Sequence, residues 1–293
     1  MATERPLVVI VGPTASGKTS LAVRLAKEFG GEIISADSRA VYRGLDIGTA
    51  KPSVEDRQGV PHWGIDIVDP DQRFTAIDFQ SYASEMIDTI RARGRVPFLV
   101  GGTGLYVDSV LYGYKFPAGV GDLDRRERLM KLSLEDLYSY CGENNIELPE
   151  NMKNKRYVVN NILRNGANLK RNNTILTNSI VVGIATEKSV LRSRIEQRAI
   201  EMFASDIISE ARGLAERYGW NCEAMTGNIY PMIHEYLDGH ITKQEALQKF
   251  IVQDWRLAKR QSTWFRRSEH VVWQSADDAY TYLAHYLAPG SDS

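Results

Sequence analysis

The chain has 293 residues, a formal net charge of −1, and hydrophobic and charged shares of 43% and 25%. These values are ordinary for a globular enzyme and leave room for one large domain or a domain with an insertion. They exclude a global basic field, so any contact with nucleic acid must come from local patches. Neither a signal peptide near Met1 nor an apolar run of bilayer length is evident, and we therefore expect a cytoplasmic protein without a membrane segment.

The first predicted element is a strand at Leu7–Val11, which leads through a glycine-rich loop into a segment with helical spacing. The loop residues are Gly12, Pro13, Thr14, Ala15, Ser16, Gly17, Lys18 and Thr19. In this arrangement backbone N–H groups and the positive end of the helix surround a phosphate. We expect Lys18 to reach the outer phosphate and the Thr19 hydroxyl to bind Mg²⁺. The pattern predicts a diphosphate or triphosphate site without saying which.

A second predicted strand, Glu32–Ala36, is closed by Asp37. A carboxylate at this end of a parallel strand lies beside the phosphate loop, where such sheets bind their ligands. The polar residues 37–52 follow, with glycines and basic side chains such as Arg39 and Lys51. This segment is either a surface for phosphate and base contacts or a solvated loop.

The pattern next predicts a short edge strand at Pro61–Asp69, a stretch that contains Ile65–Val68. A capping box at Thr75 and Asp78 opens an amphipathic helix that runs to about Arg93. Another buried strand, Val96–Val100, leads into Gly-Gly-Thr-Gly-Leu-Tyr at 101–106. This turn would place Thr103 over the phosphate loop, although a tight strand-to-helix turn explains the glycines equally well.

Residues 114–179 carry few strand signals, and we expect a helical insertion with helices around 124–138 and 153–164. Residues 151–186 contain lysines, arginines and asparagines but no Asp or Glu. This composition suits either a polyanion backbone or a solvated helix face.

The remaining chain alternates again between strands and helices. The predicted elements are a strand at 180–185, a long helical region to Tyr218, a helix capped by Thr242 and Glu245 that reaches Arg267, a strand at 271–273 and a helix at 277–287. The alternation predicts an α/β fold, a P-loop NTPase-like parallel sheet flanked by helices. Residues 1–113 and 180–293 would form the core.

Five motifs follow one another: Gly-Pro-Thr-Ala-Ser-Gly-Lys-Thr at 12–19, Asp-Ser-Arg-Ala-Val-Tyr-Arg-Gly-Leu-Asp-Ile-Gly-Thr-Ala-Lys-Pro at 37–52, Gly-Gly-Thr-Gly-Leu-Tyr at 101–106, Arg-Ile-Glu-Gln-Arg at 194–198 and Ala-Lys-Arg-Gln-Ser-Thr-Trp-Phe-Arg at 258–266. Together they resemble the tRNA dimethylallyltransferase family in its bacterial form, over nearly the whole chain. That family attaches an isopentenyl group to N6 of adenosine 37 beside the tRNA anticodon. The 37–52 and 258–266 segments are more specific than the phosphate loop.

The resemblance implies that the phosphate loop binds the diphosphate of dimethylallyl diphosphate, with Mg²⁺ on Thr19. Asp37 would accept the N6 proton, and Thr103 would contact the reacting groups. The residues expected to touch tRNA are Asp37, Ser38, Arg39, Ala40, Thr103, Arg125, Arg126, Lys155, Arg156, Lys259 and Arg260. Nothing in the sequence demands more than a monomer.

The chain departs from the family's usual pattern at Ala40, where glutamine is usual, and around Asn160, Pro231 and Trp255, where basic residues are usual. These changes would affect the binding of tRNA or of diphosphate. Three alternatives therefore stay open: an adenylate isopentenyltransferase acting on free AMP or ATP, a nucleotide kinase, and a homologue that binds tRNA without catalysis.

Overall fold

The structure is a computed structural model that describes residues 5–117, 122–167 and 170–288. The chain divides into two compact units, one formed by Met1–Leu111 with Ile175–Ser293 and the other by Tyr112–Thr174. The sequence places the helical insertion at 114–179, whereas contacts within the structure bound the smaller unit at Tyr112 and Thr174.

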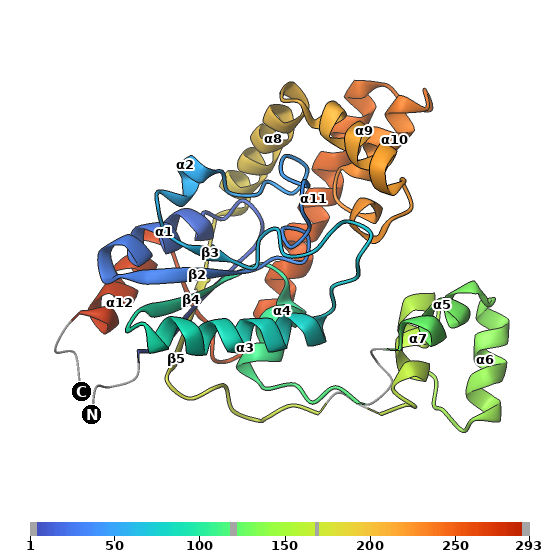
Figure 1. The fold of residues 1–293 in the computed structure, drawn as a ribbon, viewed down its shortest axis with the longest axis horizontal. Helices are drawn as coiled ribbons and strands as arrows, with labels where there is room; N and C mark the ends of the chain where they lie inside the picture. Colours follow the sequence, from blue (N-terminus) through green and yellow to red (C-terminus); the bar gives the residue numbers. More distant parts are fainter. Residues whose placement is uncertain (1–4, 118–121, 168–169, 289–293) are drawn as a thin grey trace. The chain divides into compact units, whose positions relative to one another are not determined.

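The larger unit (Figure 1) is built on one six-stranded sheet, and its strand order is β3-β2-β4-β1-β5-β6. The strands are β1 Leu7–Val11, β2 Gly31–Ala36, β3 His62–Trp63, β4 Val96–Gly101, β5 Ser179–Ile184 and β6 Val272–Gln274. Every neighbouring pair is parallel, with Val11 of β1 opposite Gly101 of β4 and Gly183 of β5. The predicted parallel α/β sheet is confirmed, and its register brings the ends of β1, β2 and β4 to one edge.

Helices cover both faces of this sheet. The helices of the larger unit are α1 Lys18–Phe29, α2 Val54–Arg57, α3 Ala76–Ala92, α4 Gly104–Leu111, α8 Lys188–Ala204, α9 Ile207–Tyr218, α10 Tyr230–Leu237, α11 Lys243–Phe265 and α12 Ala276–Leu287, with a 3₁₀ turn at Glu223–Thr226, and those that pack on the sheet include α1, α3, α4 and α12. On one face, Leu25 of α1 and Leu283 of α12 pack with Val8 and Phe98. Because strand side chains alternate, Leu99 points to the other face, where α3 and α4 pack.

A second hydrophobic core joins α8, α9, α10 and α11 to the beginning of the 37–52 segment. Val41, Tyr42 and Leu45 are buried in it together with Phe203 and Tyr230. This segment is therefore attached to a packed helical layer rather than being a solvated loop. In the described part of the chain, no helix combines the length and apolarity needed to cross a bilayer.

The short edge strand predicted within Pro61–Asp69 is present as β3, but it is shorter than expected. Pairing with β2 is confined to His62–Trp63, and Ile65–Val68 is not a strand. The Trp63 indole donates a hydrogen bond to the buried Glu32 carboxylate at 2.7 Å, which ties β3 to β2. Immediately afterwards Gly64 and Asp66 adopt φ of 78° and 56°, and these left-handed residues turn the backbone away from the sheet.

Two predicted helices are interrupted. The helix expected at 124–138 is broken at Ser133, whose side chain accepts a hydrogen bond from Asp136 N and so begins a new helix. The helical region expected up to Tyr218 is split between α8 and α9, where the Ser205 hydroxyl donates to Met202 O at 2.7 Å. Local side-chain hydrogen bonds compete with the helical ladder at both places.

The smaller unit contains α5 Leu123–Lys131, α6 Leu134–Glu143 and α7 Lys155–Leu163. Their shared core includes Leu129, Leu137, Val158 and Ile162. An antiparallel bridge between Lys115 and Lys170 joins the segments that lead into and out of these helices. The unit is helical, as the sequence predicts for this region.

Candidate active site

The phosphate loop connects β1 to α1 and leaves the beginning of α1 without a side-chain cap. Gly17 occupies the cap position with φ of 89°, a conformation that favours glycine. The Lys18 ammonium donates to Pro13 O at 3.0 Å. The Ser16 hydroxyl is buried and has no hydrogen-bond partner among the described residues. Uncapped N–H groups and an unpaired hydroxyl in one loop suit an anion.

A cavity of about 270 Å³ lies over this loop. Its walls include Lys18 and Thr19 from the start of α1, Asp37 after β2, Lys51 and Arg198 of α8. Burial lowers the pKa of the Lys18 ammonium to about 8, although the Asp37 carboxylate opposes this shift. The structure thus brings two predicted site residues, Lys18 and Asp37, to one cavity from separate strands.

Asp37 and Thr103 both form hydrogen bonds with the backbone of the loop that follows β2. Asp37 Oδ1 accepts hydrogen bonds from Arg39 N at 2.8 Å and Ala40 N at 3.3 Å. The Thr103 hydroxyl accepts from Ser38 N at 3.0 Å, and Thr103 N donates to Ala36 O at 3.1 Å. The two loops that follow β2 and β4 are therefore joined directly beside the cavity.

Helix α11 contacts both the phosphate loop and the glycine turn at 101–104, and the sequence analysis did not predict these contacts. Gln261 Oε1 accepts from Thr14 N of the phosphate loop at 2.8 Å. A Cβ on Gly102 would lie 2.3 Å from Gln261 Nε2, so only glycine fits there without displacement. The sequence analysis singled out the motif at 258–266 for its basic residues, but the side-chain amide of Gln261 makes the contact with the phosphate loop.

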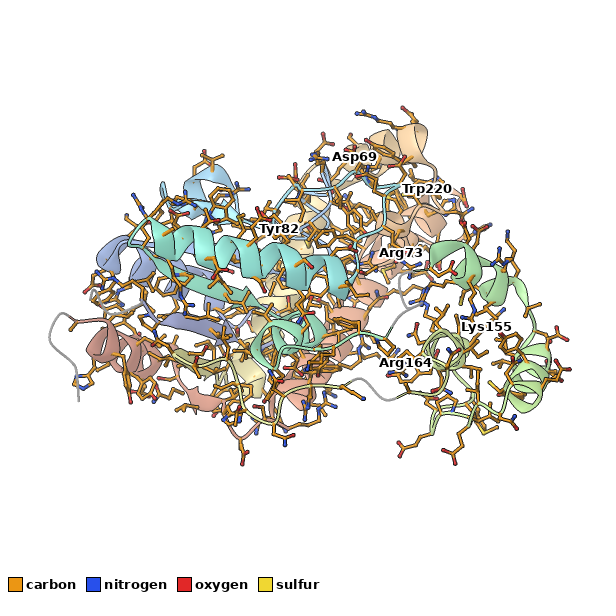
Figure 2. All side chains as sticks on the ribbon, turned by 60° about the horizontal axis from the view of Figure 1, so that its bottom comes forward. Asp69, Arg73, Tyr82, Lys155, Arg164 and Trp220 are labelled. Atoms are coloured by element: carbon orange, nitrogen blue, oxygen red, sulfur yellow. The ribbon has the colours of Figure 1, made fainter. Side chains whose placement is uncertain are left out.

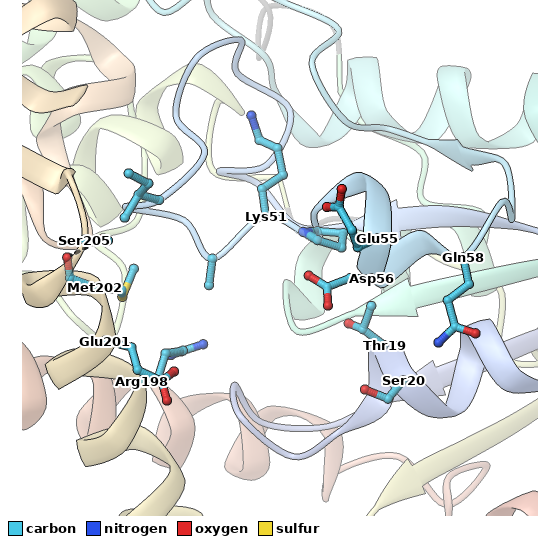
Figure 3. A pocket seen from close by; sticks show the side chains of 13 residues that line it. Thr19, Ser20, Lys51, Glu55, Asp56, Gln58, Arg198, Glu201, Met202 and Ser205 are labelled. Carbon is cyan, nitrogen blue, oxygen red and sulfur yellow. Dashed lines mark hydrogen bonds between the residues drawn. The ribbon is translucent and has the colours of Figure 1, made fainter. Parts of the chain in front are cut away.

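Arg198 is a second cation of the cavity that sequence reasoning left without a role. Its Nη2 is paired with Asp254 Oδ2 of α11, and the two side chains are 24% and 6% exposed. Arg198 Nε is buried with no hydrogen-bond partner in the described part of the chain. The same arginine also lines a neighbouring cavity of about 660 Å³, where Figure 3 shows it across from Thr19. Its cationic side chain is thus held at the boundary of both cavities.

Lys51 does not offer its charge to a ligand. Its side chain is 3% exposed, and its ammonium contacts Asp46 and Asp66 carboxylates, each at 2.6 Å, and Tyr42 O at 2.9 Å. Of the predicted tRNA contacts in this segment, the Arg39 guanidinium donates to Glu223 O at 2.9 Å, and Ala40 is buried. The predicted contacts on α11, Lys259 and Arg260, are both exposed.

The remaining predicted tRNA contacts lie on the helices of the smaller unit. Arg125 donates to the Tyr140 hydroxyl at 3.1 Å, and Arg126 donates to Asn160 Oδ1. Lys155 and the exposed Arg156 form the first turn of α7, and Figure 2 labels Lys155 on this helix. The basic stretch thus places charges at the beginning of a short helix whose other face is buried.

Two positions that depart from the family's pattern have clear local roles. Pro231 stands in the first turn of α10, where a missing N–H costs nothing. Trp255 has the Lys259 ammonium 5.2 Å from its ring centroid, within the range of a cation–π contact.

The cavity offers few protein ligands for a metal ion. Within the described residues, no group of three or more His, Cys, Asp or Glu side chains is placed to hold one. Thr19 and Asp37 supply oxygen atoms on the cavity wall. This sparse oxygen set fits Mg²⁺, which is usually completed by phosphate oxygens and water.

The parallel sheet, the glycine-rich loop with its uncapped helix and the cationic cavity are the features of a P-loop-like α/β protein. A family model described as IPP transferase matches residues 40–268, and one described as isopentenyl transferase matches residues 6–66. The first of these covers well over half of the chain. The chain therefore belongs to the IPP transferase family.

Curated relatives and solved structures agree with this assignment. The tRNA dimethylallyltransferases of Geobacillus kaustophilus and Geobacillus thermodenitrificans are 36% and 37% identical, covering 95% and 93% of this chain and 93% and 91% of those proteins. The full-length tRNA isopentenylpyrophosphate transferase from Bacillus halodurans aligns with a TM-score of 0.74 at 36% identity over 97% of both chains. A eukaryotic dimethylallyltransferase acting on tRNA shares the fold at 19% identity, with a TM-score of 0.75 over 95% of this chain and 75% of that chain.

Proposed function

We propose that the protein transfers a dimethylallyl group from dimethylallyl diphosphate to N6 of adenosine 37 in the anticodon loop of tRNA, releasing diphosphate. Membership of a family whose relatives carry this activity in their names supports the proposal. The observation that carries it is the shared cavity, where Lys18 and Arg198 provide an anion site and Asp37 provides a carboxylate.

Breaking the allylic C–O bond leaves negative charge on the diphosphate, and the loop is preorganised for that charge. Lys18, Arg198 and the uncapped N–H groups of α1 supply positive charge and donors. With a pKa of about 8 the Lys18 ammonium is mostly protonated at neutral pH, and a bound diphosphate would hold its proton more firmly. Mg²⁺ held by the Thr19 hydroxyl and diphosphate oxygens would neutralise further charge on the leaving group.

The acceptor amine must lose a proton, and in this proposal Asp37 takes it. Arg39 N and Ala40 N both donate to its Oδ1, which orients the carboxylate, and Oδ2 would accept the proton. Such general-base help is worth roughly 10²–10⁴-fold in rate. The Thr103 hydroxyl, joined to Ser38, would orient the reacting groups. Adenosine 37 would have to leave the anticodon-loop stack to reach this cavity.

Basic side chains, of which Arg156, Lys259 and Arg260 are exposed, would hold the tRNA through its phosphates. The candidates are Arg125, Arg126, Lys155 and Arg156 in the smaller unit and Lys259 and Arg260 on α11. Ser38, Arg39 and Ala40 follow Asp37 directly and would line the adenosine pocket. A chain with a net charge of −1 can bind RNA only if such positive charges are concentrated locally.

The test is incubation with Mg²⁺, dimethylallyl diphosphate and an unmodified tRNA that carries adenosines at positions 36 and 37, followed by nucleoside mass spectrometry. AMP and ATP are offered in parallel as acceptors. We expect isopentenyladenosine in the tRNA alone. Product on the free nucleotides alone would establish the adenylate-type enzyme, and tRNA binding without any product would establish a non-catalytic homologue.

The matched variants are Asp37→Asn and Asp88→Asn, the latter an exposed carboxylate on α3. Asp37→Asn should lower transfer by at least about 10²-fold, because the amide cannot accept the proton. Binding of tRNA should stay within about twofold in both variants, and Asp88→Asn should keep full activity. Full activity of Asp37→Asn would remove Asp37 from the mechanism.

A further inference from the structure

One carboxylate holds the backbone of the segment that walls the cavities. Glu210 lies on α9, and its Oε2 accepts hydrogen bonds from Asp46 N at 3.0 Å and Ile47 N at 2.7 Å. Its Oε1 accepts from Gly48 N at 2.9 Å. Three consecutive backbone donors thus converge on one side chain that is more than 160 residues away in sequence. Charged acceptors of backbone N–H groups form the stronger class of hydrogen bonds.

A buried tyrosine completes this contact. The Tyr230 hydroxyl donates to Glu210 Oε1 at 2.8 Å, and the ring is fully buried. Burial and the neighbouring Glu210 carboxylate raise the pKa of Tyr230, so the hydroxyl keeps its proton and remains a donor. A Cβ on Gly48 would lie 2.5 Å from the Tyr230 hydroxyl, which shows how closely the backbone lies on the ring.

The held segment continues directly into the cavity wall. The 270 Å³ cavity, which Lys18 and Asp37 line, is also lined by Thr49, Ala50, Lys51 and Pro52. Residues 50–52 line the neighbouring 660 Å³ cavity as well (Figure 3). Lys51 is itself bound to the Asp46 carboxylate. A change in the position of residues 46–48 is therefore transmitted to the wall that a bound diphosphate would touch.

We propose that Glu210 is a positioning residue that, with Tyr230, sets the place of residues 46–52 and thereby the affinity of the site for diphosphate. It lines neither cavity and acts only through the backbone it holds. The proposal rests on the proposed function only for the choice of substrate, since any ligand anchored at the phosphate loop would contact the same wall.

The variants are Glu210→Gln and Tyr230→Phe, with Glu216→Gln as the control. The glutamine replaces one carboxylate oxygen by an NH₂ group, which cannot accept from the backbone donors that converge there. Tyr230→Phe keeps the packing of the ring and removes only the donated hydrogen bond, so it carries the test if Glu210→Gln does not fold. Glu216 is exposed on the same helix.

Three measurements separate positioning from a merely structural role: hydrogen exchange of residues 44–52, the binding of inorganic diphosphate by calorimetry, and KM against kcat in transfer. We expect exchange to be faster in Glu210→Gln, diphosphate binding to weaken about tenfold and KM for dimethylallyl diphosphate to rise by a similar factor, with kcat within about twofold. Tyr230→Phe should change the same quantities less, and Glu216→Gln should change none.

Faster exchange with unchanged diphosphate affinity would overturn the proposal, because the contact would then be structural alone. Unchanged exchange in both variants would overturn it as well, since the segment would not depend on Glu210. If the wild-type protein transfers no dimethylallyl group, the proposed function fails, but exchange and diphosphate binding still decide the role of Glu210.

Discussion

Replacing Lys18 by methionine should stabilise the free protein at pH 7. Burial lowers the pKa of this lysine from 10.5 to about 8, which corresponds to about 3 kcal/mol of unfavourable free energy for the charged form. Methionine removes the charge and retains an unbranched apolar side chain. The variant also loses the hydrogen bond to Pro13 O, worth about 1 kcal/mol. A net gain of about 2 kcal/mol corresponds to about 3 °C in Tm for a chain of this length.

The pH dependence of this difference identifies its cause. Below pH 8 the lysine is charged in both the folded and the unfolded state, so the wild type carries the full penalty. Between pH 8 and 10.5 the folded state has released the proton and the unfolded state has not, so the stability of the wild type rises relative to the variant. By pH 10.5 the advantage of Lys18→Met should be gone.

The assay is calorimetric unfolding of the wild type, Lys18→Met and Lys27→Met from pH 6.5 to 10.5 in buffer free of phosphate and diphosphate. Lys27 is an exposed lysine of the same helix, so its replacement should shift Tm by less than about 1 °C at every pH. A Lys18→Met protein that is less stable than the wild type at pH 7 would refute the reasoning. So would an advantage that persists unchanged to pH 10.5.

Two further variants test the loops and the smaller unit. Gly102→Ala places a Cβ 2.3 Å from Gln261 Nε2, so Gln261 must move and lose its hydrogen bond from Thr14 N. We expect the affinity for diphosphate, measured by calorimetry, to fall about fivefold with little change in Tm. An unchanged affinity would contradict this prediction. Lys155→Glu combined with Arg156→Glu should weaken tRNA binding and reduce its salt slope by about 2, measured by fluorescence anisotropy at several salt concentrations. Lys131→Glu is the control, and an unaltered slope in the double variant would exclude α7 from the RNA contact.

The parts of the fold that depend on neighbouring residues were predictable from the sequence. The capping boxes at Thr75 and Thr242 start α3 and α11 where expected, because each requires only a partner three residues further on. The apolar runs of β1, β4 and β5 likewise mark central strands of a parallel sheet. Since the carboxyl ends of such strands meet at one edge, Asp37 and Thr103 could each be expected beside the phosphate loop.

Contacts between distant residues could not be predicted in this way. Nothing in the local sequence links Glu210 to residues 46–48, Asp254 to Arg198, or Gln261 to Thr14. Because Glu210 lies far from residues 46–48 in the sequence, residues 37–52 could be interpreted either as a binding surface or as a solvated loop. Composition shows which side chains are basic but not which of them, like Lys51, are already paired inside the protein.

The chain leaves the sheet-bearing unit and returns to it at neighbouring points. Leu176 N donates a hydrogen bond to Leu111 O at 2.7 Å. These two residues belong to the larger unit and lie just before and just after the smaller unit in the sequence. Two chain ends held this close can be joined by a short turn. The intervening helices can therefore be exchanged, lengthened or trimmed in evolution or by grafting, while the fold that carries the chemistry is inherited intact.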